Sequence, residues 1–146
     1  APGLSLVEIT LVVAIVAVVS AVALPRFGGS NADARLRAAA LRVERDVALA
    51  RQHAVATSKP VTISFSSSGY AIPGLTSLDR RAATYTASLS EEPFRVTLTM
   101  IKFGSGNTLT FDMHGTPSSN GTLQLTTAGR NVTLLIDDQI GRVTRP

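Results

Sequence analysis

Apolar residues dominate the start of the chain. Between Leu4 and Leu24 only Glu8 carries a charge. The run is close to the ~20 residues that an α-helix needs to cross a lipid bilayer. It predicts a hydrophobic helix over residues 4–29, kinked near Pro25 and loosened by the Gly28-Gly29 pair.

Residues 30–59 predict a second, amphipathic helix that links this segment to the rest of the chain. Six apolar side chains recur there at three-four spacing and share one helix face: Leu36, Ala40, Val43, Val47, Ala50 and Ala54. Arginines occupy the other faces, either as a solvated surface or as contacts to neighbouring subunits or an anionic polymer. His53 is interpreted as a surface or boundary residue, and Lys59-Pro60 ends the helix.

From residue 60 to 146 the hydrophobic period changes from nearly four to two. This pattern predicts strands at 61–65, 70–72, 84–88, 94–101, 108–113, 122–126, 132–136 and 139–144. Residues 73–83 are expected to form a loop and Asp137-Asp138 a tight turn. The predicted fold class is therefore α+β, with a C-terminal antiparallel, sandwich-like head.

Composition excludes several kinds of chemistry. The 146 residues contain no cysteine and two histidines, so neither disulfides nor thiolate or histidine-rich metal sites are expected. The net charge of +4 permits an anionic partner without requiring one. We expect no cofactor and no metal, and adjacent Asp137 and Asp138 are a weak signal for calcium.

The apolar segment has three simpler interpretations. A signal peptide would have a basic start and a shorter apolar run, and a buried soluble helix would not need valines all round. A plain membrane anchor remains the main alternative. Glu8 argues against it, because a carboxylate inside a membrane helix costs roughly 2.5–3.5 kcal/mol and normally has a functional partner.

Gly3, apolar Leu4 and Glu8 at the fifth position after the junction resemble the prepilin-peptidase signal of type IV pilins and type II secretion pseudopilins. The resemblance implies that residues 1–3 remain from a leader, that prepilin peptidase cuts after Gly3 and that Leu4 becomes N-methylated. The new amine would then lie one helical turn from Glu8, and their pairing would set the register of assembly. The chain would span the inner membrane once, with its head in the periplasm or outside the cell, before joining a filament.

The stretch from Asp46 to Val55, followed by Lys59-Pro60-Val61, resembles the GspH/FimT branch of these families. The closing region resembles it too, through the following residues: Phe111-Asp112, Gly115, Pro117-Ser118-Ser119, Gly121-Thr122-Leu123 and Gly141-Arg142. This resemblance implies a structural subunit of a type IV pilus or type II secretion pseudopilus, whose partners are other pilin subunits. A major pilin that forms the bulk of a surface filament is an alternative.

Two further groups of residues bear on other activities, catalysis and DNA binding. Asp112 and His114 would share a face on a strand, but without a nucleophile elbow they do not indicate an enzyme. Arg142 and Arg145 resemble the basic ending of minor pilins that bind DNA during uptake. The second arginine is displaced by one position, which puts it on the opposite face of a strand.

Overall fold

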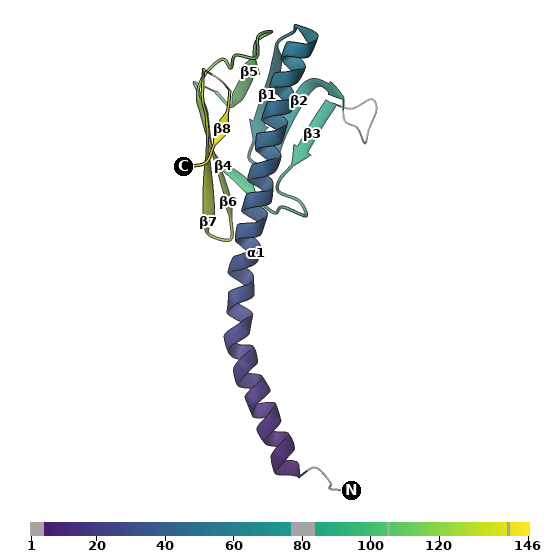
Figure 1. Ribbon diagram of the computed structural model, residues 1–146, viewed down its shortest axis with the longest axis vertical. Coiled ribbons are helices and arrows are strands. Elements are labelled where there is room, and N and C mark those ends of the chain that lie inside the picture. Colours follow the sequence, from purple (N-terminus) through teal and green to yellow (C-terminus); the bar gives the residue numbers. More distant parts are fainter. Residues whose placement is uncertain (1–4, 77–83, 105, 140) are drawn as a thin grey trace.

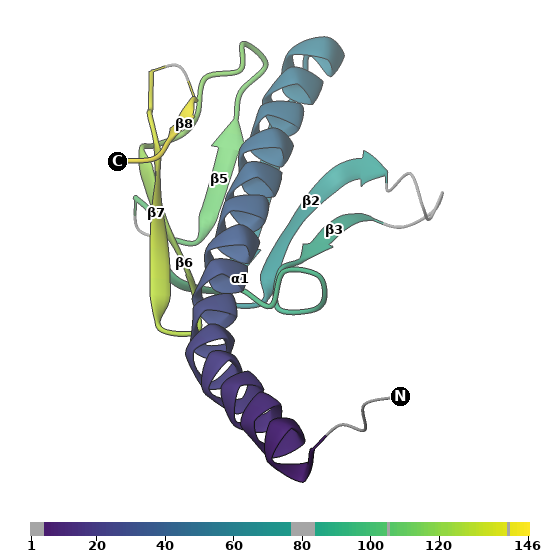
Figure 2. The same cartoon turned by 60° about the horizontal axis from the view of Figure 1, so that its bottom comes forward.

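The computed structural model describes residues 5–76, 84–104, 106–139 and 141–146, without the side chains of residues 21–30. A single long helix, α1 (Leu6–Thr57), carries a β-rich head (Figure 1). The C-terminal half of α1 lies against the head, and its N-terminal half extends away from it (Figures 1 and 2). This arrangement confirms the predicted α+β fold class.

The two predicted helical segments, 4–29 and 30–59, form one helix in the structure, and no interruption is assigned at Pro25. A proline removes one hydrogen bond of the helical ladder, and the backbone can continue helically on both sides of it. Figures 1 and 2 show that α1 is bowed. A kink localised at Pro25 stays a prediction.

The helix ends where the sequence predicts. Ser58 adopts a left-handed conformation, and its N–H donates to the carbonyl of Val55 while that of Lys59 donates to the carbonyl of Ala54. These bonds satisfy carbonyls that the last helical turn would otherwise leave free. The chain then enters the first strand at Val61.

The predicted number and order of strands are confirmed within the described residues. The strands are β1 (Val61–Ser66), β2 (Gly69–Thr76), β3 (Thr84–Ser88), β4 (Thr97–Phe103), β5 (Thr108–Phe111), β6 (Gly121–Thr127), β7 (Arg130–Ile136) and β8 (Val143–Thr144). They form two antiparallel sheets, in the orders β3-β2-β1-β5 and β4-β6-β7-β8.

Most strand boundaries differ from the prediction by one to four residues, and three of the differences have evident local reasons. Strand β2 continues through Pro73 to Thr76, because a register shift against β3 accommodates the proline. Strand β5 stops at Phe111, since Asp112 begins a turn. Strand β8 is short because a turn from Asp137 to Gly141 precedes it, as the prediction for Asp137-Asp138 required.

The core lies between α1 and the inner faces of both sheets. All six helix positions of the predicted apolar face are buried, with at most 2% of each residue exposed. Phe65 of β1 stacks on Phe103 of β4, with ring centroids 5.0 Å apart, and so joins one sheet to the other. The head is therefore a sandwich-like unit closed by the helix.

Candidate functional site

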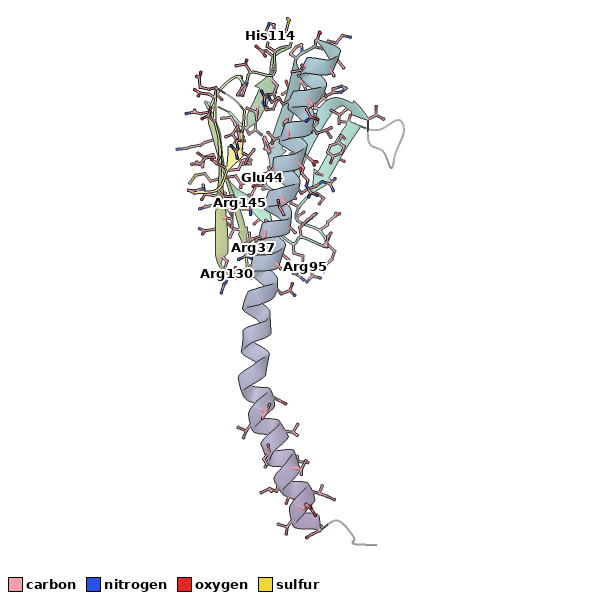
Figure 3. All side chains as sticks on the ribbon, in the orientation of Figure 1. Arg37, Glu44, Arg95, His114, Arg130 and Arg145 are labelled. Atoms are coloured by element: carbon pink, nitrogen blue, oxygen red, sulfur yellow. The ribbon has the colours of Figure 1, made fainter. Side chains whose placement is uncertain are left out.

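The most unusual surface is the N-terminal half of α1. Every residue from Ser5 to Ser20 is exposed. The large apolar side chains among them are between 52% and 76% accessible: Leu6, Val7, Ile9, Leu11, Val12, Val13, Ile15, Val16, Val18 and Val19 (Figure 3). A continuous apolar surface of this kind marks a site of interaction with protein or lipid. In the described part of the chain, no helix combines the length and hydropathy that a membrane crossing requires.

Glu8 is the single charge on this surface. It lies in the first turn of α1, where a carboxylate interacts favourably with the helix dipole. Its side chain is exposed and forms no ion pair with the described residues. Gly3 and Leu4, the predicted cleavage and methylation positions, lie outside the described residues.

Arg142 and Arg145, the two predicted DNA contacts near the C-terminus, do not form one exposed basic surface. Arg145 forms an ion pair with Glu44 of α1, in which its Nε and one Oε atom are 2.7 Å apart (Figure 3). The hydrogen bond to this carboxylate raises the pKa of Arg145 above its ordinary value. Arg142 is exposed instead, beside α1. The structure therefore gives the two predicted DNA contacts different environments.

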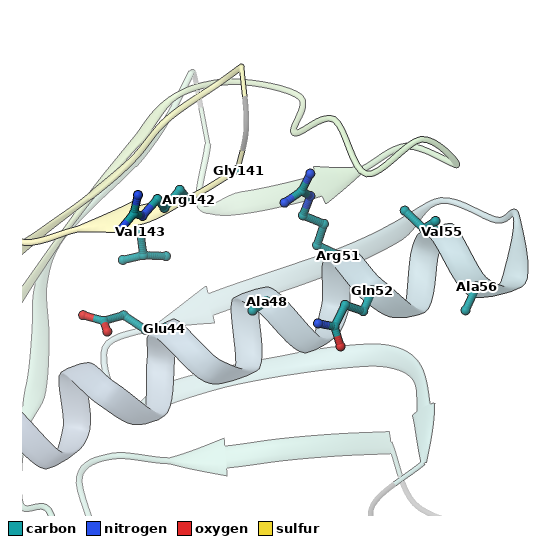
Figure 4. Close-up of a pocket in the computed structure, with 9 residues that line it drawn as sticks. All are labelled: Glu44, Ala48, Arg51, Gln52, Val55, Ala56, Gly141, Arg142 and Val143. Carbon is teal, nitrogen blue, oxygen red and sulfur yellow. The ribbon is translucent and has the colours of Figure 1, made fainter.

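An open groove of about 550 Å³ lies between α1 and the segment that leads into β8 (Figure 4). Ala48, Val55, Ala56 and Val143 provide its apolar lining. Two glycines near this groove lie in close contact with other residues: Gly115 has a φ of 78°, and a Cβ there would lie 2.9 Å from Val55. Gly141 has a φ of 60°, and its Cβ would lie 2.8 Å from the ring of Phe111. Both belong to the closing region that resembles the family.

The opposite side of α1 holds a polar cluster that the sequence analysis missed. The buried carboxylate of Asp46 accepts hydrogen bonds from the hydroxyls of Tyr70, at 2.6 Å, and Tyr85, at 2.7 Å. Arg42 donates to the same oxygen from 3.0 Å. Burial and the nearby Asp46 charge raise the pKa of Tyr70 far above its ordinary value. The cluster ties β2 and β3 to the helix.

One signal in the sequence could have revealed this cluster. Asp46 lies three residues after Val43 and four before Ala50, so it falls on the edge of the predicted apolar face. A carboxylate at such a position needs donors from elsewhere in the fold. The only two tyrosines of the chain supply them.

The expectation that Asp112 and His114 share a strand face was wrong. Both lie in the turn after β5, where Oδ1 of Asp112 accepts the backbone N–H groups of Thr116 and His114. These hydrogen bonds, the one from Thr116 above all, hold the pKa of Asp112 below its ordinary value. Among the residues that the structure describes, no three potential ligands converge as a metal site would require.

Comparison with known proteins identifies the class of this fold. A family model described as type II transport protein GspH matches residues 39–139, more than half of the chain. The chain therefore belongs to the GspH family of pilin-like subunits. A search of curated proteins found no match.

Two crystal structures of the type IV minor pilin FimU from Pseudomonas aeruginosa PAO1 share the fold. The first, in space group P21, has 23% sequence identity and a TM-score of 0.55, and covers 76% of this chain and 87% of FimU. The second, in space group P65, has 22% identity and a TM-score of 0.53, and covers 76% and 92%. The family model thus assigns the chain to the GspH type II transport proteins, and the two crystal structures show that its fold is that of a minor pilin.

Proposed function

We propose that this protein is a structural subunit of a type II secretion pseudopilus or type IV pilus that assembles through its N-terminal helix. One observation carries the proposal: a well-packed head is joined to a helix half whose described apolar side chains, from Leu6 to Val19, are more than half exposed and lie outside the core of the head. Burying that surface against other subunits removes it from water, at roughly 25 cal/mol per Å². The role is mechanical and needs no catalytic residue.

Before assembly, the apolar segment from Leu4 to Leu24 would span the inner membrane and hold the head in the periplasm. The full apolar run, which extends beyond the side chains that the structure describes and contains Glu8 as its single charge, supports that topology. On assembly the same helices would leave the lipid and pack together as the filament core. The head would then lie on the outside of the filament.

Glu8 would set the register of subunits in that core. Prepilin peptidase would cut after Gly3, and Leu4, then N-methylated, would present its amine one turn from the carboxylate. A carboxylate in an apolar core is costly unless a positive group meets it. Only subunits packed at the correct height would satisfy this requirement.

Two alternative functions are a major pilin and a DNA-binding minor pilin. A major pilin would use the same assembly surface, so its abundance in filaments decides between the two roles. DNA binding through Arg142 and Arg145 is less favoured, because Arg145 is already paired with Glu44. Phosphate attraction by the remaining charge would be sensitive to salt and independent of sequence.

The test compares Glu8→Ala with Thr10→Ala in native cells, because Thr10 lies on the same helix half but carries no charge. We expect both variants to reach the membrane fraction at wild-type levels. Glu8→Ala should lower the amount recovered in sheared filaments by about tenfold or more. The α-amine of Leu4 would then lack its carboxylate partner, and an unmatched charge costs several kcal/mol in an apolar core. Quantitative mass spectrometry of the filaments measures this amount. It also measures the fraction of the total filament protein that consists of this chain. Normal recovery of Glu8→Ala would sink the register argument, and absence of the wild-type chain from filaments would leave only a membrane anchor.

A further inference from the structure

The C-terminal half of α1 has a second apolar face, opposite the one that packs on the head. Its members are all exposed, and we call them the outer face: Ala38, Leu41, Arg45, Ala48, Leu49 and Gln52. Leu41 and Leu49 remain 42% and 40% accessible although the head is fully folded. Ala48 and Gln52 are visible on this side of the helix in Figure 4. An apolar helix face that its own head leaves uncovered is a docking surface for another chain.

Arg45 lies at the centre of this outer face and makes no ion pair with the described residues. Neighbouring arginines are used within the chain: Arg42 binds Asp46, and Arg51 donates to the carbonyl of Gly115 from 3.1 Å. The acidic neighbour Glu44 is used as well, because it binds Arg145. The outer face therefore presents one uncompensated guanidinium within apolar surroundings.

The partner must supply a carboxylate within an apolar surface. Most described acids after the N-terminal half of α1 are engaged: Asp33, Glu44 and Glu92 form ion pairs, Asp46 is buried, and Asp112 accepts backbone N–H groups. Glu8 has the required character, because it is exposed, forms no ion pair with the described residues and is surrounded by Leu6–Val19 apolar side chains. The two surfaces are complementary in charge and in apolar character.

We infer that the outer face receives the N-terminal half of α1 from a second copy of this chain, with Glu8 facing Arg45. The inference rests on the proposed filament function. All copies in a filament point the same way, so the two helices run parallel. Glu8 and Arg45 are ~37 residues apart, which fixes an axial offset of about 55 Å between the copies. The same offset places Val12 on Leu49 and Leu11 on Ala48.

This contact is compatible with pairing between Glu8 and an α-amine. A carboxylate has two oxygens and can accept hydrogen bonds from a guanidinium and an amine at once. Pairing with the amine would connect Glu8 only to the start of a helix. Pairing with the guanidinium of Arg45 would connect it to the part of α1 that packs on the head of another copy. Arg45 would thereby connect the helix core to the outer layer of heads.

Disulfide trapping tests the register directly, because the chain has no cysteine of its own. The test protein carries Val12→Cys and Leu49→Cys, and the matched control carries Val12→Cys and Leu41→Cys on the same face with similar exposure. Bridged cysteines need Cα atoms within about 7 Å, whereas two helical turns displace the control by about 12 Å. Within one chain Val12 and Leu49 are about 55 Å apart along the helix, so every disulfide joins two copies.

We expect oxidised filaments of the Val12/Leu49 protein to give a covalent ladder on gels and the Val12/Leu41 protein to give none. Filaments that contain the chain but show no more cross-linking at Leu49 than at Leu41 would overturn the inference while leaving the proposed function intact. Cross-linking only to a different pilin, through a cysteine placed there, would overturn the assignment to a second copy. If wild-type chain is absent from filaments, both proposals fail.

Charge substitution provides an independent readout. We expect Arg45→Glu to reduce the chain recovered in filaments by about tenfold or more, because a desolvated charge pair is replaced by repulsion. Arg37→Glu, on an exposed part of the same helix, should leave recovery within about twofold. Head stability should be unchanged in both variants, which separates lost assembly from lost folding. Equal recovery of Arg45→Glu and Arg37→Glu would contradict the assigned pairing.

Discussion

The two halves of α1 have the same backbone conformation but opposite surroundings. In the N-terminal half, apolar residues occupy the whole circumference, and the large apolar side chains that the structure describes, from Leu6 to Val19, are exposed. In the C-terminal half, the apolar residues are divided between a face buried in the head and the outer face around Arg45. Secondary structure alone therefore says little about the role of either half.

The distribution of apolar residues around the helix carries the functional information. A helix that is apolar all round must be enclosed on every side, which one head cannot do. A helix with two apolar faces can join its own head to a neighbouring helix. In this proposal the N-terminal half of α1 serves assembly, whereas the buried face of the C-terminal half serves folding. Substitutions in the two halves should therefore affect assembly and folding separately.

The largest effect should come from a charge placed in each half. Val47→Asp puts an unpaired carboxylate into the core, and we expect the head to lose more than about 4 kcal/mol of stability. Val13→Asp should change head stability by less than about 0.5 kcal/mol and abolish filament incorporation. Urea unfolding of the full chain in detergent, followed by circular dichroism, measures the first quantity. Equal destabilisation by both substitutions would show that the halves do not act separately.

Two polar contacts attach the C-terminal half of α1 to the head, the Asp46 cluster and the Glu44–Arg145 ion pair, and their loss should have smaller and unequal effects on stability. Asp46→Ala leaves two tyrosine hydroxyls without their acceptor, and we expect a loss of about 2–4 kcal/mol. Glu44→Ala breaks an ion pair that is partly open to solvent, and the expected loss is below about 1 kcal/mol. Urea midpoints compare the variants under identical conditions. A larger loss for Glu44→Ala would reverse the ranking of these contacts.

Alkaline pH should produce a graded effect that reports on the same cluster. The pKa of Tyr70 is raised in the folded state, so the folded chain keeps a proton that the unfolded chain releases near pH 10. Stability should therefore be constant with respect to this group below about pH 10 and fall above it by about 1.4 kcal/mol per pH unit.

Tyr70→Phe provides the control, since it removes the titrating group and should flatten this decline. Some decline of stability with pH should remain in this variant, because the pKa of Tyr85 is also raised. Phenolate absorbance follows ionisation of these two tyrosines alone, because the chain has no others. Ionisation of both at pH 10 in the folded wild type would contradict the arrangement around Asp46.

Much of the fold could be predicted from the sequence because its patterns are local. The face from Leu36 to Ala54 follows helical spacing, and Val61, Ile63 and Phe65 alternate as a half-buried strand does. The strand ends were harder to predict. Asp112 gives no periodic signal, and its role in a turn depends on the backbone of Thr116.

Contacts between distant positions could not be predicted by the same means. Nothing local indicates that Asp46 meets Tyr70 and Tyr85, or that Glu44 occupies Arg145. The second pairing matters for function, since it changes how a basic C-terminal motif is interpreted. Glu8 was identifiable from sequence because its surroundings are uniformly apolar. Arg45 was not, because only the folded head shows which helix face stays uncovered.

The pairing of Glu44 with Arg145 also has a consequence for the order in which the protein is made. The two residues are 101 positions apart, and the buried helix face contacts strands from both sheets. A nascent chain exposes part of this face until β6 and β7 have been synthesised, and contacts between such distant positions form slowly. During synthesis the helix therefore presents apolar side chains along both halves, and the two halves become different only when the last strands pack.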